Sequence, residues 1–160
     1  MIEIGEAILP EDVAVVRELL QEYERALGVD LCFQNFAREL ADLPGGYAPP
    51  RGTLLLARAG GSIAGCVALR PVDDATCEMK RLYVRDAFRA IGLGRRLVER
   101  VIGDAQALGY RRMVLDTLPT MTAAQRLYES LGFTDTSAYR HNPIAGTRFL
   151  RRELDTPARA

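Results

Sequence analysis

The spacing of hydrophobic residues changes several times in the first third of the chain, and each spacing predicts an element. Apolar and polar residues alternate over 2–8, which is typical of a strand. Apolar residues three and four positions apart over 13–27 predict an amphipathic helix with an acidic outer face, which Gly28 ends. A second helical pattern covers 30–43. The breaker-rich run 44–52, PGGYAPPRG, then predicts a loop.

The middle of the chain combines short apolar runs with a long amphipathic one. The runs 53–58 and 62–70 flank an Ala-Gly-Gly turn, so they predict a β-hairpin. A third strand is expected at 76–84, beside this hairpin. Apolar residues at helical spacing over 92–109 then predict a helix with one buried face.

The last third predicts a crossover and a closing pair of strands. A short apolar strand at 112–117 follows the helix, and strand–helix–strand order implies a parallel crossover. Thr122 and Gln125 have capping-box spacing, which predicts a helix over 122–132. Two further strands are expected at 133–139 and 147–154. This order of elements predicts the α/β class with a mixed sheet.

Length and composition are those of one ordinary globular domain. The chain has 160 residues, of which 48% are hydrophobic and 26% are charged. No repeat or low-complexity linker divides it, so 1–160 is expected to form a single domain. The tail 155–160 is expected to be frayed.

The charge balance and the hydropathy argue against two classes of partner. The 21 basic residues equal the 21 acidic ones, which disfavours a general nucleic-acid binder. No apolar run reaches membrane-spanning length, and the N-terminus has no basic segment followed by an apolar one. We therefore expect no nucleic acid, no membrane and a cytoplasmic location. Arginine is concentrated in 85–112, however, where it suits an anionic ligand.

The three cysteines indicate no metal centre. Cys32, Cys66 and Cys77 are odd in number and lack CxxC or Cys/His spacing. They are expected to be reduced, buried thiols. No histidine lies near any of them in the sequence, which gives no support for a covalent acyl-enzyme.

The run RAIGLG at 89–94 joins a predicted strand to a predicted helix. The N-terminus of a helix carries unpaired N–H groups and a positive partial charge, so it suits a phosphate. The P-loop pattern fails because Arg95 and Arg96 follow Gly94. The dinucleotide pattern fails because Leu97 replaces its third glycine. What remains is RxxGxG, whose simpler interpretation is a tight turn before a helix.

Three motifs together are more specific. RLYV at 81–84, RAIGLG at 89–94 and LYESLGF at 127–133 resemble, in order and spacing, the GNAT superfamily of acyl-CoA-dependent N-acyltransferases. The resemblance covers about 54–154. It implies a six- or seven-stranded mixed sheet flanked by about four helices and splayed between its fourth and fifth strands. Coenzyme A would lie in that central cleft, and the N-terminal helices would cover the acceptor side.

The resemblance also implies which residues bind the cofactor. The backbone of one strand would bond the pantetheine arm, and the glycine-rich turn would wrap the pyrophosphate. A small residue would let the cofactor lie against the next helix. The expected cofactor-binding residues are Leu82, Tyr83, Val84, Arg89, Ala90, Ile91, Gly92, Leu93, Gly94, Arg95 and Ala124. Met121 stands where many relatives have Asn, so a side-chain bond to the cofactor is not expected there.

Two catalytic residues follow from the same resemblance. Tyr128 matches the tyrosine that protonates the departing thiolate; the alternative is a core aromatic residue. Glu78 is expected to act as the base through water; the alternative is a charge pair with Lys80 or Arg81. A backbone N–H near Leu82 would stabilise the oxyanion.

The expected activity is an acetyl-CoA-dependent N-acetyltransferase that uses direct, ternary-complex transfer and no metal. The acceptor is a small-molecule or peptide amine that the sequence does not identify. Two alternatives stay open: a catalytically silent CoA-binding sensor, and an enzyme that modifies proteins or aminoacyl groups. A homodimer also stays an open alternative. The acidic residues of 1–43 favour a cationic amine, or else form a solvated helix face. Candidate acceptor-pocket residues are Phe33, Phe36, Tyr47, Tyr83, Tyr139, Arg140 and His141.

Overall fold

The computed structural model describes residues 1–29, 31 and 35–154. Seven strands form one mixed sheet in the order β1-β2-β3-β4-β5-β7-β6. The strands are β1 (Ile2–Glu6), β2 (Thr53–Ala59), β3 (Ser62–Pro71), β4 (Thr76–Val84), β5 (Arg112–Thr117), β6 (Thr134–Asp135) and β7 (Arg148–Glu153). The α-helices are α1 (Val13–Leu27), α2 (Phe36–Asp42), α3 (Leu93–Ala107) and α4 (Thr122–Ser130). The mixed sheet with four α-helices confirms the predicted fold class.

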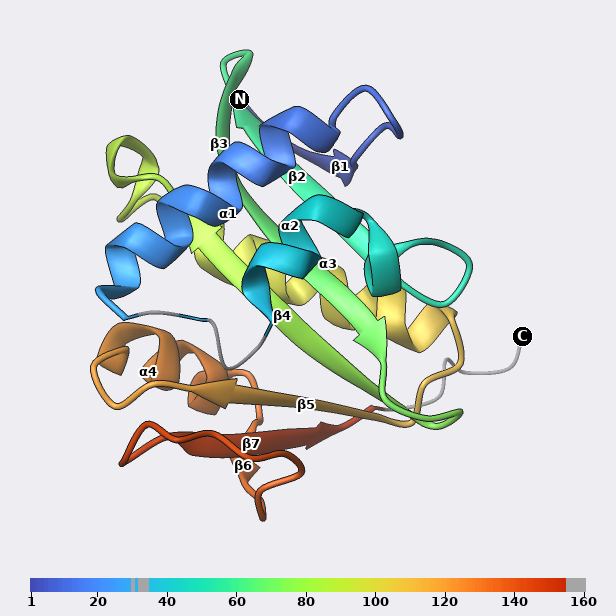
Figure 1. Ribbon diagram of the computed structural model, residues 1–160, viewed down its shortest axis with the longest axis vertical. Helices are drawn as coiled ribbons and strands as arrows, with labels where there is room; N and C mark the ends of the chain where they lie inside the picture. Colours follow the sequence, from blue (N-terminus) through green and yellow to red (C-terminus); the bar gives the residue numbers. More distant parts are fainter. Residues whose placement is uncertain (30, 32–34, 155–160) are drawn as a thin grey trace.

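The sheet is covered on both faces, so it divides the interior into two cores. Figure 1 shows α1 and α2 on one face and α3 on the other. Leu54 and Leu56 of β2 pack toward α1 and α2, whereas Leu55 packs toward α3. This alternation follows from the two-residue repeat of a strand, and it explains why the central residues of β2 and β3 are apolar on both faces.

The centre of the sheet opens between β4 and β5. These strands are parallel, and their ladder runs from Thr76–Arg112 to Glu78–Val114. Beyond Glu78, β4 continues to Val84 and β5 continues away from it, as Figure 1 shows. The splay leaves the second half of β4 without a strand partner on its β5 side.

A β-bulge lies in β4 at this opening. Ala68 pairs with Lys80 and Cys66 with Tyr83, so two residues of β4 oppose one of β3. Arg81 takes a φ of 61° there. The extra residue lets the Lys80 and Arg81 side chains share the α1–α2 side, while Leu82 packs toward α3.

Most predicted elements are confirmed, including the hairpin and the parallel β4–α3–β5 crossover. The predicted helix 30–43 is described only as α2, because 30 and 32–34 lie outside the described residues, as does the tail 155–160. The predicted strand 133–139 is wrong in extent, since β6 contains only Thr134 and Asp135.

The predicted capping box is also wrong. Met121, not Thr122, is the N-cap of α4, and no side chain caps this helix. The Gln125 side chain instead donates to the Leu118 carbonyl at 2.8 Å, which holds the loop after β5 against α4.

Candidate active site

A cleft of about 420 Å³ lies where β4, the turn before α3 and the start of α4 meet. Its lining residues are Leu82, Val84, Phe88, Arg89, Ala90, Gly92, Leu93, Gly94, Arg95, Ala123, Ala124 and Leu127. All predicted cofactor residues are among them except Tyr83 and Ile91. Tyr83 faces α1, where its hydroxyl donates to Glu22 at 3.4 Å, and Ile91 is 51% exposed. Since both were predicted to act through the backbone, their roles stay predictions.

The turn before α3 presents backbone N–H groups to this cleft. Gly92 has a φ of 78° and caps the helix, a conformation that glycine adopts without strain. The first helical bond runs from the Arg96 N–H to the Gly92 carbonyl, so the N–H groups of 93–95 precede it. A Cβ added at Gly94 would lie 3.7 Å from Leu127, an ordinary contact. Among the described residues, no protein contact demands glycine at 94, and this is compatible with a ligand that approaches the backbone closely there.

Two arginines stand at the rim of the cleft. Arg89 donates to the Val84 carbonyl at 3.0 Å and pairs with Asp86, and Arg95 donates to Ser130 at 3.1 Å. Their side chains are about half-exposed. Exposed pairs of this kind contribute little stability, so either guanidinium can exchange its partner for a phosphate at low cost.

A second, narrower cavity of about 30 Å³ lies on the other side of Leu82 and is lined by residues of β4, β5 and α4. Tyr128 of α4 and Lys80 of β4 are among its lining residues, and Leu82 lines both hollows. Tyr128 packs edge-to-face on Phe133 at 5.8 Å within the α3-side core. Burial raises the pKa of Tyr128, so its hydroxyl is protonated at neutral pH.

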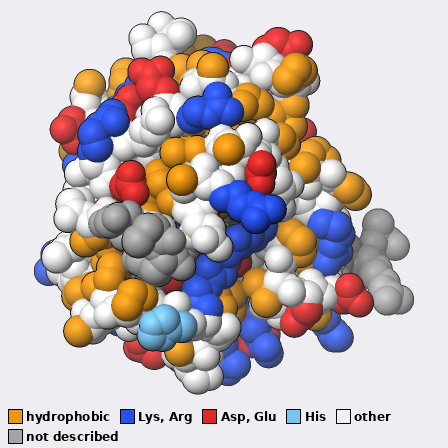
Figure 2. Space-filling model, viewed as in Figure 1, with side chains coloured by type: hydrophobic (Ala, Val, Ile, Leu, Met, Phe, Trp, Pro, Cys, Tyr) orange, Lys and Arg blue, Asp and Glu red, His pale blue; other side chains and the backbone are white. Residues whose placement is uncertain are grey.

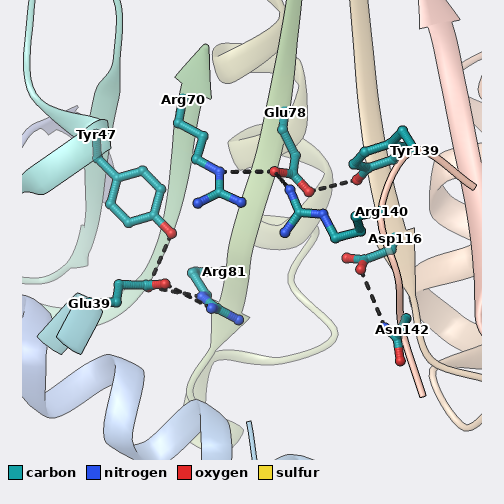
Figure 3. A network of polar contacts seen from close by, with 9 residues as sticks. All are labelled: Glu39, Tyr47, Arg70, Glu78, Arg81, Asp116, Tyr139, Arg140 and Asn142. Atoms are coloured by element: carbon teal, nitrogen blue, oxygen red, sulfur yellow. Dashed lines mark hydrogen bonds and ion pairs between the residues drawn. The ribbon is translucent and has the colours of Figure 1, made fainter. Parts of the chain in front are cut away.

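Glu78 lies fully buried on the α1–α2 side of β4, at the point where the sheet divides. Arg70 Nε donates to one carboxylate oxygen at 2.9 Å, and the Tyr139 hydroxyl donates to the other at 2.6 Å. Arg140 Nη2 also donates to Glu78 (Figure 3). Burial opposes ionisation, but the charges of Lys80, Arg70 and Arg140 outweigh it and lower the pKa of Glu78.

The bulge residue Arg81 forms a second buried pair. Its side chain is 2% exposed and donates to the Glu39 carboxylate of α2 at 3.0 and 2.8 Å. The Tyr47 hydroxyl donates to the same carboxylate at 3.0 Å, and the guanidinium lies over the Phe36 ring at 5.1 Å. Figure 3 shows this pair beside the Glu78 group. The contact fastens α2 to the bulge.

Lys80 lies between these two groups and is 6% exposed. Burial, followed by repulsion from Arg81, lowers its pKa to about 7, although Glu78 opposes the shift. At neutral pH a substantial fraction of this amine is therefore uncharged, and Lys80 and Tyr128 both line the narrow cavity.

Several predicted acceptor-side residues meet here, and others do not. Tyr139 and Arg140 contact Glu78, and Tyr47 contacts Glu39. His141 is exposed, and Phe33 lies outside the described residues. Of the acids in 1–43, Glu22 and Glu39 bond Arg85 and Arg81, so these two are already neutralised; whether the region favours a cationic amine stays a prediction.

Sequence reasoning missed Arg70, Lys80 and Arg81 as site residues. One signal for the bulge is present in the sequence: Lys80 and Arg81 are consecutive polar residues in a strand that otherwise alternates. Arg70 is the cross-strand partner of Glu78, which becomes apparent only once the hairpin register is known.

Comparison with known proteins identifies the family. Residues 14–133 match the model of the acetyltransferase (GNAT) family. The chain belongs to this family. It is 46% identical over 155 residues to an uncharacterized N-acetyltransferase of Schizosaccharomyces pombe, covering 96% of this chain and 95% of that protein. It is also 36% identical over 110 residues to N-acetylaspartate synthetase of Rattus norvegicus, covering 68% of this chain and 37% of that protein.

Solved GNAT structures have the same fold. A GNAT acetyltransferase of Staphylococcus aureus superposes with a TM-score of 0.79 at 22% identity, covering 97% of this chain and all of that one. A putative acetyltransferase of Salmonella typhimurium, solved with its cofactor acetyl-CoA, superposes with a TM-score of 0.67 at 26% identity, covering 99% and 96%. This chain is thus a GNAT acyltransferase, and the family assignment predicted from its three motifs is confirmed.

Two further features concern the described residues only. They contain no group of three or more His, Cys, Asp or Glu side chains placed to hold a metal ion. None of the helices they form has both the length and the apolar character needed to cross a bilayer.

Proposed function

We propose that this GNAT protein transfers the acetyl group of acetyl-CoA to a primary amine by direct attack in a ternary complex. The observation that carries the proposal is the cleft beside the splayed half of β4, which ends at the N–H groups that open α3. A helix N-terminus and two half-exposed arginines suit a pyrophosphate. An unpaired strand segment suits the amides of a pantetheine arm.

The reaction requires three events at the inner end of the cleft. The amine nitrogen attacks the thioester carbonyl carbon, and the Leu82 N–H at the bulge stabilises the resulting oxyanion. When the carbon–sulfur bond breaks, the Tyr128 hydroxyl gives its proton to the thiolate. Burial raises the pKa of Cys66 and Cys77 to about 12, so neither forms a thiolate at neutral pH. This favours direct transfer.

Two neighbouring side chains compete for the role of proton acceptor. Glu78 was predicted to fill it and stays a candidate, but its bonds to cationic groups and its lowered pKa make it a weak base. Lys80 shares the cavity with Tyr128 and has a pKa of about 7, which suits a base acting at neutral pH. We therefore assign proton acceptance to Lys80.

A pH profile separates the two bases. The values of kcat/KM are first corrected to the neutral form of the acceptor amine. If Lys80 accepts the proton, the corrected kcat/KM rises with pH through about 7, because only the uncharged Lys80 side chain is a base, and Lys80→Met removes that rise. Glu78→Gln should leave the rise in place. A profile that Lys80→Met leaves unchanged and Glu78→Gln flattens would reverse the assignment.

The acceptor is proposed to be a small molecule. N-acetylaspartate synthetase, a relative, is named for the synthesis of a small N-acetylated molecule, which supports this choice over a protein acceptor. A peptide amine stays the alternative, as does a CoA-binding sensor without turnover. A cytoplasmic location and a homodimer stay predictions.

The deciding experiment measures CoA release with an amine panel and acetyl-CoA binding by calorimetry. Tyr128→Phe should lower kcat strongly while binding acetyl-CoA with unchanged affinity. Tyr110→Phe is the matched control, because Tyr110 is similarly buried but its hydroxyl donates to the backbone carbonyl of Arg51, and Tyr110 lines neither hollow. Equal turnover in wild type and Tyr128→Phe removes Tyr128 from its role. Binding without turnover on any amine favours the sensor, and label from acetyl-CoA appearing in lysate proteins favours a protein acceptor.

A further inference from the structure

Two arginines from distant parts of the chain meet around the carboxylate of Glu78. Arg70 ends β3 and is the register partner of Glu78, whereas Arg140 comes from the connection between β6 and β7. Both donate to the same oxygen, Oε1, and Figure 3 shows their guanidinium groups on either side of it. Because Arg70 and Arg140 are two cations and Glu78 is one anion, the three side chains together have a net positive charge.

These arginines have more donors than Glu78 can use. A guanidinium has five N–H donors, and the Glu78 carboxylate already accepts from three side chains. Arg140 Nε is buried and, within the described part of the chain, has no hydrogen-bond partner. A buried donor of this kind is costly, so it favours a ligand that brings an oxygen acceptor. A carboxylate matches the planar fork of a guanidinium best.

The arginine pair is reachable from outside and close to the reaction centre. The Arg70 and Arg140 side chains are 32% and 25% exposed. Arg70 also lines an open pocket of about 260 Å³ beside α2. Figure 2 shows a run of Lys and Arg side chains down the middle of the face that carries α1 and α2. Lys80 follows Glu78 by two residues, which is roughly 7 Å along a strand. A small amine that also carries a carboxylate can therefore reach from the arginines at Glu78 to Lys80.

We propose that the acceptor amine carries a carboxylate, which Arg70 and Arg140 bind while the amine faces Lys80. This substrate class rests on the proposed N-acetyltransferase function. The carboxylate takes no part in bond changes: the amine nitrogen forms the bond to the acetyl carbon, and the thiolate leaves with a proton. Glu78 is a positioning residue that holds the two guanidinium groups in place. The products are an N-acetylamino acid and CoA.

The first test uses wild-type protein and matched acceptors. CoA release is measured with L-alanine, L-aspartate and L-glutamate and with their carboxamides, each rate corrected to the neutral amine. We expect kcat/KM to be about 10- to 100-fold higher for an acid than for its amide, as for a lost charged hydrogen bond. Amides that react as well as acids overturn the substrate class and leave the acetyltransferase function standing. Acetyl-CoA binding without turnover of any amine overturns both.

The second test assigns the selectivity to the arginines. Arg140→Gln and Arg70→Gln should raise KM for the acid about tenfold or more, with KM for acetyl-CoA unchanged, so that the acid-to-amide ratio falls toward one. Arg112→Gln is the control, because Arg112 also pairs with a glutamate, Glu153, but is 43% exposed and donates to neither oxygen of Glu78. If neither Arg140→Gln nor Arg70→Gln changes the acid-to-amide ratio of kcat/KM, the arginines only neutralise Glu78 and the proposal fails. If the variants do not fold, the acid–amide comparison in wild type decides.

Discussion

Gly94→Ala should change stability and cofactor binding in opposite directions. An added Cβ at 94 would lie 3.7 Å from the Leu127 side chain. Among the described residues beyond the local helix backbone, it would meet nothing else within 4 Å, so the folded protein accommodates it. Alanine also costs less conformational entropy than glycine in a helix, by about 0.5 kcal/mol at this first-turn position. For a chain of this size the melting temperature should rise by about 1–2 °C.

The same methyl group should weaken acetyl-CoA binding. Gly94 lines the cleft, and its Cβ would stand where the ligand must approach the N–H groups of 93–95. Losing one charged hydrogen bond costs about 1.5–3 kcal/mol, so the dissociation constant should rise at least about tenfold. Calorimetric titration with acetyl-CoA measures it, and a melting curve without ligand measures stability.

Gly103→Ala is the matched control for this experiment. Gly103 lies in the middle of the same helix, is exposed, and has no atom within 4 Å of a built Cβ. It should gain about 1 kcal/mol of stability with no change in acetyl-CoA affinity. If Gly94→Ala binds acetyl-CoA as tightly as Gly103→Ala does, the ligand does not approach the backbone closely at 94, and this part of the proposed donor site is refuted.

Two further predictions concern buried charges on β4. Arg81→Met should cost about 3–5 kcal/mol in urea unfolding, because it leaves Glu39 buried without its cation, and adding Glu39→Leu should recover most of the loss. A loss below about 1 kcal/mol would show that this pair does not fasten α2. Lys80 has a folded pKa of about 7 against an ordinary 10.5, so the unfolded state binds more protons between these values and stability should rise with pH across that window. Lys80→Met should flatten this rise, which is measured as the free energy of unfolding in urea at pH 7 and pH 9. If the free energy of the variant depends on pH as strongly as that of wild type, the lowered pKa of Lys80 is contradicted.

The lining of the cleft beside β4 was predictable because its signals are local. Motifs lie in β4 at 81–84, in the turn 89–94 and at 127–133 in the second half of α4, and residues of all three segments line the cleft. Strand–helix–strand order leaves little freedom in how such segments pack. The cleft lining therefore follows from the sequence almost residue by residue.

The acceptor side was less predictable because its contacts join distant segments. Arg140 reaches Glu78 across 62 positions of sequence, and Arg81 reaches Glu39 across 42. The predicted strand 133–139 is shorter than expected, since β6 ends at Asp135, and Tyr139 beyond it donates to Glu78. Helical or strand periodicity describes which face is apolar, and it does not say which charges meet.

The most direct test of the proposed acetyl-CoA site is hydrogen–deuterium exchange with and without saturating acetyl-CoA. We expect slower exchange at the backbone amides of 82–84 and 89–95, with no change in the β2–β3 turn at 59–61. Protection of these two segments would place the pantetheine arm on β4 and the pyrophosphate at the start of α3. Unchanged exchange at both segments under saturating ligand would contradict the proposed donor site.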